Sequence, residues 1–394
     1  MEIEYVICHY SEIGLKGKNR KFFEEKLIEN IKRVLKPAYF DFVKRISGRI
    51  IVKLTKEGIK NEKEIKEALG KVFGIAHFSF AISSPQKIKN IQEEALKILK
   101  NRKFKTFRIT TQRSKKDFYL TSQQINERVG EYILQRTKNK EQKTKIKVDL
   151  ESPDITCFIE IVEKFAFLYF EKIKGLGGLP TNTGGKVIVL ISGGIDSPVA
   201  SFFSMKRGIK AVFLHFHAYP YTDEASIGKV KKLVKVLSEY QGKSKLYLVP
   251  FADIQKEIFL KTPAKLRVIL YRRFMLQIAE EIAKKERALG VFTGENLGQV
   301  ASQTLENIKV IEAVTSLPIF RPLISNDKEE IIKKAKEIGT FEISILPHQD
   351  CCSRFLPKHP ETKARLEEVL MAEKKLNINK LINNTIDKTT FQLI

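Results

Sequence analysis

Apolar and polar positions at the start of the chain repeat with the periods of both strands and helices. The pattern predicts, in order, a strand at 2–9, a helix at 22–35, two strands within 38–54, a helix at 62–69 and a strand at 72–82. This β-α-β-β-α-β order is that of a ferredoxin-like fold. We therefore expect a ferredoxin-like domain over residues 1–75.

A second group of predicted elements follows directly. It comprises helices at 87–99 and 121–136 and strands at 105–111, 145–150, 155–162 and 165–171. This mixture indicates a second α/β domain over residues 76–174. A glycine-rich linker, 174–185, separates it from the rest of the chain.

Beyond the linker, strands and helices alternate regularly. The predicted order is strand 186–191, helix 198–206, strand 210–216, helix 224–240, strand 245–250, helix 263–285, strand 289–293 and helix 298–312. This rhythm predicts a doubly wound parallel sheet in a third domain, residues 175–394, so the fold class is α/β throughout. In such folds the ligand lies beyond the carboxyl ends of the strands. His215-Phe216-His217 and Thr293-Gly294-Glu295 end two of these strands and are expected at that rim.

The turn after the first strand of this domain carries the clearest chemistry. It reads Ser192-Gly193-Gly194-Ile195-Asp196-Ser197, and a helix resumes at Pro198. Backbone N–H groups of such a turn and the positive end of the helix dipole form an anion site, most naturally for phosphate. It is not a Walker A loop, because no Gly-Lys-Ser/Thr follows. The alternative is an ordinary strand-to-helix turn.

Composition sets the class of protein. The chain has 394 residues, of which 43% are apolar and 30% charged, as in soluble globular proteins. No apolar run approaches membrane length, and residues 1–5 lack the features of a signal peptide. Four cysteines do not make a disulfide framework, and there is no Cys-x-x-Cys pair. We expect a cytoplasmic protein with no membrane association and no zinc or iron–sulfur cluster.

The net charge of +25 adds a candidate partner. Residues 1–175 hold 38 Lys and Arg against 23 Asp and Glu, so the excess is densest there. Such a surface favours nucleic acid through counterion release, although a merely lysine-rich solvated surface is the alternative. Candidate RNA contacts lie in a glycine-punctuated loop and at the end of the 105–111 strand: Lys16, Lys18, Arg20, Arg108, Arg113, Lys115 and Lys116.

Several motifs in order resemble one family. Ser-Gly-Gly-x-Asp-Ser is similar to the loop of PP-loop ATP pyrophosphatases, which cleave ATP between its α and β phosphates. The further motifs are Ser11–Arg20, Gly177–Pro180, Thr293–Thr304, Arg321–Ile324, Asp327–Ile332 and Asp350–Pro360. Together they resemble the tRNA 4-thiouridine synthetases (ThiI-type tRNA sulfurtransferases) over nearly the whole chain. Residues 76–174 then resemble a THUMP domain, an RNA-binding module, and the resemblance also allows a domain start near residue 60.

The resemblance implies replacement of the 4-oxygen of uridine 8 in tRNA by sulfur. That oxygen is first adenylated with loss of pyrophosphate, and AMP leaves when sulfur adds at carbon 4. Asp196 would hold Mg²⁺ with ATP, and Lys328 would stabilise the adenylated intermediate, unless it is a surface lysine of its helix. By motif position the ATP site comprises Leu190, Ile191, Ser192, Gly193, Gly194, Asp196, Ser197, His215, Phe216, Arg272, Gly294 and Gln303.

Sulfur handling is expected at the vicinal Cys351-Cys352. The nearby Arg354 and Lys358 favour the reactive thiolate. By motif position Cys352 is the first candidate for nucleophile or resolving thiol and Cys351 the second. Cys8 and Cys157 lie in strand patterns and are expected in the core.

The end of the chain shapes the expected partners. Some relatives continue into a rhodanese-like domain with a second catalytic cysteine, whereas this chain ends at Ile394. A separate persulfide donor such as a cysteine desulfurase, or free sulfide, would then supply sulfur. The family's second role, sulfur transfer to a carrier protein for the thiazole of thiamine, is less strongly expected. A homodimer is expected if one tRNA spans the RNA-binding domain of one subunit and the active site of the other.

Three alternatives compete with this interpretation. Another PP-loop enzyme, such as a different tRNA thiolase or an amidating synthetase, would modify another acceptor atom. A non-catalytic tRNA-binding protein would not need an intact Ser-Gly-Gly-Ile-Asp-Ser loop. A THUMP-bearing methyltransferase would need a methyl-donor glycine motif, which the sequence lacks.

Overall fold

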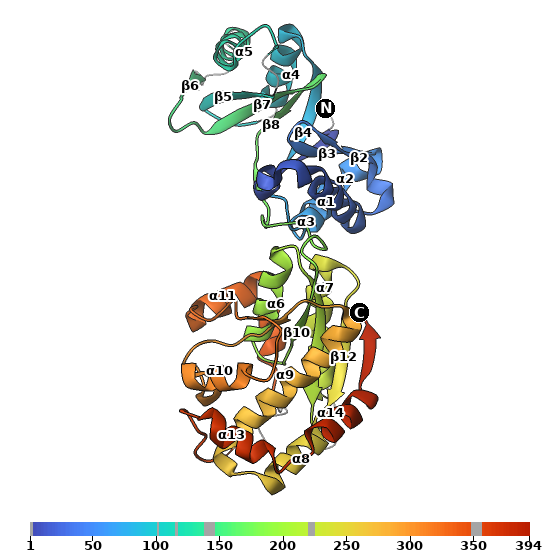
Figure 1. Ribbon diagram of the computed structural model, residues 1–394. Helices are drawn as coiled ribbons and strands as arrows, with labels where there is room; N and C mark the ends of the chain where they lie inside the picture. The colour runs from blue at the N-terminus through green and yellow to red at the C-terminus, as the bar shows by residue number, and fades with distance from the viewer. Residues whose placement is uncertain (1–2, 101, 115–116, 138–145, 220–224, 348–356) are drawn as a thin grey trace. The chain divides into compact units, whose positions relative to one another are not determined.

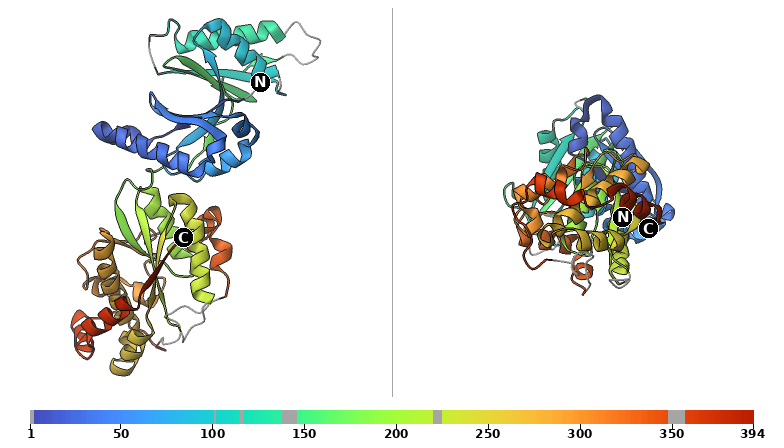
Figure 2. Two further views of the ribbon diagram at one scale, coloured as in Figure 1. Left: turned by 90° about the vertical axis from the view of Figure 1, so that its right-hand side faces the viewer. Right: turned by 60° about the horizontal axis from the view of Figure 1, so that its bottom comes forward.

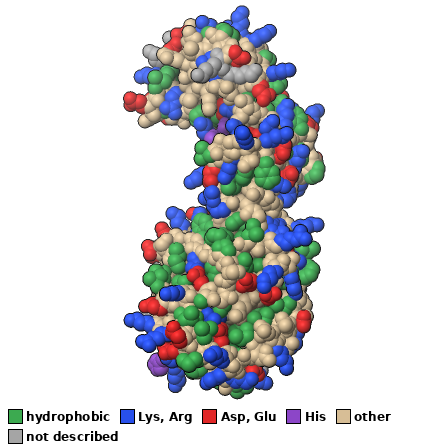
Figure 3. All heavy atoms as spheres, in the orientation of Figure 1, with side chains coloured by type: hydrophobic (Ala, Val, Ile, Leu, Met, Phe, Trp, Pro, Cys, Tyr) green, Lys and Arg blue, Asp and Glu red, His purple; other side chains and the backbone are tan. Residues whose placement is uncertain are grey.

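The computed structural model describes residues 3–100, 102–114, 117–137, 146–219, 225–347 and 357–394. The chain divides into two compact units, Met1–Pro180 and Thr181–Ile394. None of the helices within the described ranges is both long and apolar enough to cross a membrane. Lys and Arg side chains are spread over the visible face of each unit among fewer acidic ones (Figure 3).

The first unit begins with the predicted ferredoxin-like order. Its main elements are β1 (Tyr5–His9), α1 (Arg20–Val34), β2 (Phe40–Ile46), β3 (Arg49–Leu54), α3 (Glu62–Leu69) and β4 (His77–Pro85), with short helices η1 (Glu12–Asn19), η2 (Pro37–Tyr39) and α2 (Lys56–Lys60). Apolar residues of α1 and α3, among them Leu27 and Ile65, pack on Val6 and Val52 of the strands. Both helices therefore cover one face of this part of the sheet (Figure 2).

The THUMP-like part continues the same sheet. Its elements are α4 (Ile88–Lys100), β5 (Thr106–Arg113), α5 (Ser122–Thr137), β6 (Lys147–Val148), β7 (Ile155–Val162), β8 (Phe165–Tyr169) and β9 (Ile173–Lys174). β4 pairs with β1 through Tyr5↔Ala81 and with β8 through Ile82↔Leu168. One sheet of order β2-β3-β1-β4-β8-β7-β5-β6, with β9 on β4, thus runs through both parts of this unit.

A buried polar cluster joins the strands of this sheet from both parts of the unit. Glu160 on β7 forms an ion pair with Arg49 Nη2 on β3 at 2.7 Å and contacts His9 Nε2 on β1 at 2.9 Å. The Tyr169 hydroxyl on β8 donates to the same carboxylate at 2.5 Å. Burial alone would raise the pKa of Glu160, but the hydrogen bonds and charges of these neighbours lower it to about 2. The carboxylate is therefore ionised and holds both parts of the unit together.

The second unit is a doubly wound sheet of order β14-β13-β10-β11-β12-β15. Its strands are β10 (Lys186–Leu190), β11 (Lys210–His217), β12 (Lys245–Pro250), β13 (Val291–Phe292), β14 (Ile319–Phe320) and β15 (Thr390–Leu393). β10, β11, β12 and β13 are parallel, as predicted; β14, which was not predicted, is parallel to β13, and β15 is an antiparallel edge strand beside β12. Its helices are α6 (Asp196–Lys206), α7 (Ala225–Gln241), α8 (Ala252–Lys261), α9 (Arg267–Glu286), α10 (Leu305–Glu312), α11 (Lys328–Ile338), α12 (Phe341–Ser344), α13 (Leu366–Glu373) and α14 (Ile378–Asp387).

Helices cover the two faces of this sheet in two groups. α6 packs with α7 and α11, whereas α9 packs with α8, α10 and α14 (Figure 1). The helix predicted at 298–312 begins only at Leu305, because Gly298 has a φ of 74° and Thr304 caps the helix through Asn307 N. The residues just before α10 are therefore not part of this helix and lie at the edge of the sheet, beside the pocket described below.

Candidate nucleotide site

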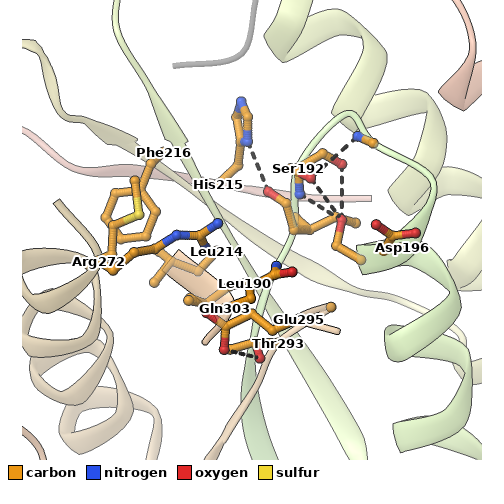
Figure 4. Close-up of a pocket in the computed structure, with 15 residues that line it drawn as sticks. Leu190, Ser192, Asp196, Leu214, His215, Phe216, Arg272, Thr293, Glu295 and Gln303 are labelled. Atoms are coloured by element: carbon orange, nitrogen blue, oxygen red, sulfur yellow. Dashed lines mark hydrogen bonds between the residues drawn. The ribbon is translucent and has the colours of Figure 1, made fainter. Parts of the chain in front are cut away.

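The loop between β10 and α6 is shaped by two serine side chains. Ser197 Oγ accepts from the Ser192 backbone N–H at 2.9 Å and lies 3.2 Å from Ser192 Oγ. Ser192 Oγ in turn accepts from the Gly194 N–H at 3.3 Å. These bonds, drawn in Figure 4, fold the turn back onto the start of α6. The amide groups of the first helical turn therefore border the same concavity as the loop.

Gly294 brings a second strand end against this loop. A Cβ built on Gly294 would lie 2.7 Å from the Ser197 backbone nitrogen and 2.9 Å from the Asp196 carbonyl carbon. Only glycine permits this approach of the segment after β13 to the beginning of α6. This backbone contact explains the glycine of the Thr293-Gly294-Glu295 motif.

A pocket opens where the loop, the end of β11, α9 and the segment after β13 meet. The lining residues are Leu190, Ile191, Ser192, Gly194, Asp196, Ser197, Leu214, His215, Phe216, Arg272, Met275, Thr293, Gly294, Glu295 and Gln303 (Figure 4). It is at the carboxyl edge of the parallel strands, where ligands of such folds bind.

The pocket combines an apolar wall with a few polar groups. Leu190, Leu214, Phe216 and Met275 supply apolar surface suited to a flat base. The amide oxygen of Gln303 is buried and, within the described part of the chain, has no hydrogen-bond partner. A ligand donor at this point would satisfy it. Together with the loop amides, this donor and acceptor set fits a nucleotide with its base in the pocket and its phosphates at the loop.

Ionic contacts and hydrogen bonds fix the side chains at the edge of the pocket. Arg321 Nε donates to Glu295 Oε2 at 2.7 Å, and Arg321 also binds Glu312 on α10. Thr293 Oγ1 donates to the same Glu295 oxygen at 3.0 Å. His215 is oriented by a 3.0 Å contact between Nδ1 and the Ile191 carbonyl oxygen. Glu295 and His215 are each about 5% exposed or less, so their positions are set by these partners.

Asp196 meets a cation from a distant part of the chain. Lys328 Nζ, at the start of α11, lies 2.6 Å from Asp196 Oδ1, and Gln299 Nε2 donates to Oδ2 at 3.3 Å. The capping box of Asp327 and Glu330 fixes the start of α11 and thereby the root of the lysine side chain. A carboxylate and an ammonium therefore lie together beside the loop Ser192–Ser197, which we call the phosphate loop.

The pocket offers one carboxylate, Asp196, to a metal ion that would bind together with a nucleotide. No group of three or more His, Cys, Asp or Glu side chains that could hold a metal ion by itself occurs in the described ranges. Mg²⁺ in nucleotide sites needs only one or two carboxylates, with phosphate oxygens and water completing its octahedron. Asp196 could provide such a carboxylate.

Family comparisons agree along the whole chain. The ThiI ferredoxin-like domain matches residues 5–79, the THUMP domain residues 85–171, and the family described as Thiamine biosynthesis protein (ThiI) residues 182–378. "Probable tRNA sulfurtransferase" of Thermoanaerobacter sp. (strain X514) is 46% identical over 381 residues, covering 97% of both chains. The chain belongs to the ThiI family.

Relatives and solved structures extend this result. The "Probable tRNA sulfurtransferase" of Bacillus licheniformis is 42% identical and covers 99% of this chain and 95% of its own. The crystal structure of a 4-thiouridine synthetase–RNA complex with bound ATP has a TM-score of 0.88 and 37% identity, with 100% of both chains covered. PH1313 from Pyrococcus horikoshii Ot3 has a TM-score of 0.65 and 29% identity, with 85% of this chain and 99% of its own covered.

Most of the ATP-site residues expected from the motifs of this ThiI-family chain come together. Gly193 alone of that set is not among the lining residues. Leu214 and Met275 line the pocket but were not predicted. Leu214 pairs with Leu190 in the β10–β11 register, and Met275 lies three residues after Arg272 on α9. Only the adjacent predicted residues, Leu190 and Arg272, could have indicated them, because an apolar residue in a buried strand or helix usually belongs to the hydrophobic core.

The expected sulfur-transfer cysteines, Cys351 and Cys352, lie outside the described residues. The segment that leads to them is anchored at the phosphate loop. Ser344 Oγ donates to the Gly194 carbonyl at 3.3 Å, and the buried Lys229 donates to the carbonyls of Ser344 and Leu346, each at 2.7 Å. Sequence analysis missed Lys229, since a lysine in an amphipathic helix carries no distinguishing signal.

The two remaining cysteines are core residues, as expected from their strand patterns. Cys8 and Cys157 are free and fully buried. Burial raises the pKa of both thiols to about 12, which keeps them protonated and unreactive.

The candidate RNA contacts differ in how freely they can reach a ligand. Arg113 Nη1 donates to the carbonyls of Phe118 and Leu120, at 3.0 and 2.7 Å, so its guanidinium shapes the following loop. Arg108 Nη1 likewise donates to the Leu150 carbonyl at 2.8 Å. Lys16, Lys18 and Arg20 lie in η1 and at the start of α1. Lys115 and Lys116 lie outside the described residues.

Proposed function

We propose that this chain is an ATP-dependent tRNA sulfurtransferase that converts uridine 8 of tRNA to 4-thiouridine. The observation that carries the proposal is the meeting of Asp196 and Lys328 at the phosphate loop of a nucleotide-shaped pocket. Full-length similarity to curated tRNA sulfurtransferases and to an RNA- and ATP-bound 4-thiouridine synthetase supports it.

ATP supplies the adenylyl group that turns the uridine 4-oxygen into a leaving group, with pyrophosphate and then AMP released. The loop amides around Gly194 and the first turn of α6 hold the phosphates. Lys328, which lies 2.6 Å from Asp196 Oδ1, would neutralise charge that develops on the α-phosphate. Because it is ion-paired with Asp196 in the structure, both side chains would exchange partners when Mg²⁺ and ATP bind. Mg²⁺, when bound at Asp196, would supply charge neutralisation at the phosphates.

Sulfur would arrive at carbon 4 from the Cys351-Cys352 segment, which begins a few residues after the anchor at Leu346. A thiolate at Cys352, or at Cys351, would attack the outer sulfur of a persulfide on a separate donor such as a cysteine desulfurase. Its new S–S bond would form as the S–S bond of the donor breaks, and the donor would leave as a thiolate. The proposal includes a homodimer and a cytoplasmic location. Sulfur transfer to a carrier protein for thiamine thiazole stays a prediction.

Nucleoside analysis of bulk tRNA from a strain lacking this gene tests the proposal. We expect 4-thiouridine to be absent and to return with the wild-type gene but not with Asp196→Ala. Unchanged 4-thiouridine in the deletion strain would favour a different PP-loop tRNA thiolase. Return of 4-thiouridine with Asp196→Ala would favour a binding protein that acts through another enzyme.

A further inference from the structure

A buried carboxylate in the first unit organises two arginines from different elements. Glu24, on α1, is 3% exposed, yet it lies beside a hollow lined by basic residues. Its Oε1 accepts from Arg20 Nε at 3.2 Å and from the Tyr10 hydroxyl, and its Oε2 accepts from Arg45 Nη1 at 3.0 Å. Both carboxylate oxygens are therefore used, and the charge is compensated within the cluster.

The two guanidiniums are only partly consumed by this arrangement. The side chains of Arg20 and Arg45 are 38% and 51% exposed, whereas that of Glu24 is 5% exposed. Arg45 reaches Glu24 through Nη1, and this is the one side-chain hydrogen bond or ion pair of Arg45 within the described part of the chain. Arg20 also donates to the Tyr10 hydroxyl, from Nε at 3.0 Å and from Nη2 at 2.5 Å. An arginine has five N–H donors in a planar fork, so each guanidinium keeps donors beyond the bonds it makes here.

The hollow beside them has the shape and charge of an anion site. Its walls are the start of α1, the turn between β2 and β3, and the turn between β7 and β8. Four basic and two acidic side chains line it: Lys18, Arg20, Lys21, Arg45, Glu24 and Glu163. The Glu163 carboxylate is engaged by the Ser47 backbone N–H at 3.2 Å. Gly48, with a φ of 80°, lets the turn pass beside the Arg20 guanidinium.

We propose that Arg20 and Arg45, held by Glu24, form a clamp for a backbone phosphate of the tRNA. Fixed guanidinium pairs favour phosphate because two parallel N–H···O bonds match its geometry. Contacts of this kind set the register of an RNA without reading its bases. The inference rests on the proposed function for its RNA partner, and Glu24 acts in it as a positioning residue.

The test is the salt dependence of tRNA binding, measured by fluorescence anisotropy with labelled, unmodified tRNA. Arg45→Gln should weaken binding about tenfold at low salt and lower the slope of log affinity against log salt by about 1. Lys36→Gln is the matched control, because Lys36 is an exposed cation of the same unit that pairs with Glu64 at 2.8 Å. It should retain the wild-type slope.

Glu24→Gln separates positioning from simple charge. This change makes the protein more positive, so an unspecific electrostatic surface would bind tRNA more tightly. The clamp predicts weaker binding, because both guanidiniums lose their common anchor. Thermal unfolding of each variant checks that the fold is kept. If Glu24→Gln fails to fold, the salt dependence of tRNA binding by Arg45→Gln decides the question.

Two results would overturn the clamp: Arg45→Gln with the salt slope of Lys36→Gln, or folded Glu24→Gln that binds tRNA as tightly as the wild type. Inorganic phosphate, at equal ionic strength, competes for the same guanidiniums, so it should displace tRNA from the wild type better than chloride does and should lose this advantage with Arg45→Gln. Because binding is measured without turnover, failure of the clamp and failure of the thiolation reaction are separate outcomes.

Discussion

Gly294→Ala tests the geometry of the phosphate loop most sharply. The added Cβ would lie 2.7 Å from the Ser197 nitrogen, whereas ordinary van der Waals contact begins at 3.4 Å. The segment after β13 and the first turn of α6 must therefore separate by about 0.7 Å, since the clashing atoms are backbone and cannot rotate away. Overpacking of this kind costs about 1–3 kcal/mol of folding stability.

The functional loss should exceed the loss of stability. The Ser197 amide belongs to the helix start that borders the phosphate site, so a shift moves the ATP phosphates relative to the uridine. Misplacement of reacting groups by about 1 Å costs up to about 100-fold, so we expect kcat/KM for ATP to fall roughly 10- to 100-fold. Pyrophosphate release with unmodified tRNA measures it.

Gly228→Ala is the control for this experiment. Gly228 lies within α7, and a Cβ there meets no atom within 4 Å. The same chemical change should leave turnover intact and keep or slightly raise stability. Wild-type kcat/KM for ATP in Gly294→Ala would refute the close approach of the β13 segment to the loop.

Three further predictions concern other parts of the molecule. Asp196→Ala should abolish pyrophosphate release yet leave tRNA affinity nearly intact; a large loss of tRNA binding would contradict its role at phosphate and metal. Lys229→Met should lower 4-thiouridine formation more than pyrophosphate release, because it frees the segment ahead of the cysteines, and equal losses would count against this role. The pKa of Glu160 is lowered from 4.5 to about 2 in the folded state, so the ionised carboxylate contributes fully to the free energy of unfolding above about pH 5, and this contribution is lost as the pH falls toward 2. At 1.36 kcal/mol per pKa unit, the contribution is on the order of 3 kcal/mol. Denaturant unfolding at a series of pH values measures it, and Glu160→Gln should make the free energy of unfolding depend less on pH.

The local sequence predicted the phosphate loop well because the residues that form it are consecutive in the chain. Ser192 to Ser197 form the turn from their own side chains and amides. The parallel order of β10, β11 and β12 also followed from the alternation of strands and helices. Gly294 and Lys328 could be proposed only from motifs, because their contacts join residues far apart in the chain.

Features set by long-range pairing were not predictable from local pattern. The sharing of β4 between the two parts of the first unit depends on its register with both β1 and β8. The antiparallel edge strand β15 likewise depends on a partner, β12, distant in sequence. The buried anchor Glu24 resembles any helical glutamate until the positions of Arg20 and Arg45 are known.

The most direct test of the central claim is single-turnover thiolation of unmodified tRNA with ATP, Mg²⁺ and a persulfide donor. Wild type and Cys352→Ser are compared, and nucleosides are analysed after digestion. We predict ATP-dependent 4-thiouridine at position 8 with the wild type and none with the variant. Equal product from both would remove Cys352 from the sulfur path, whereas no 4-thiouridine from the wild type would contradict the proposed function itself.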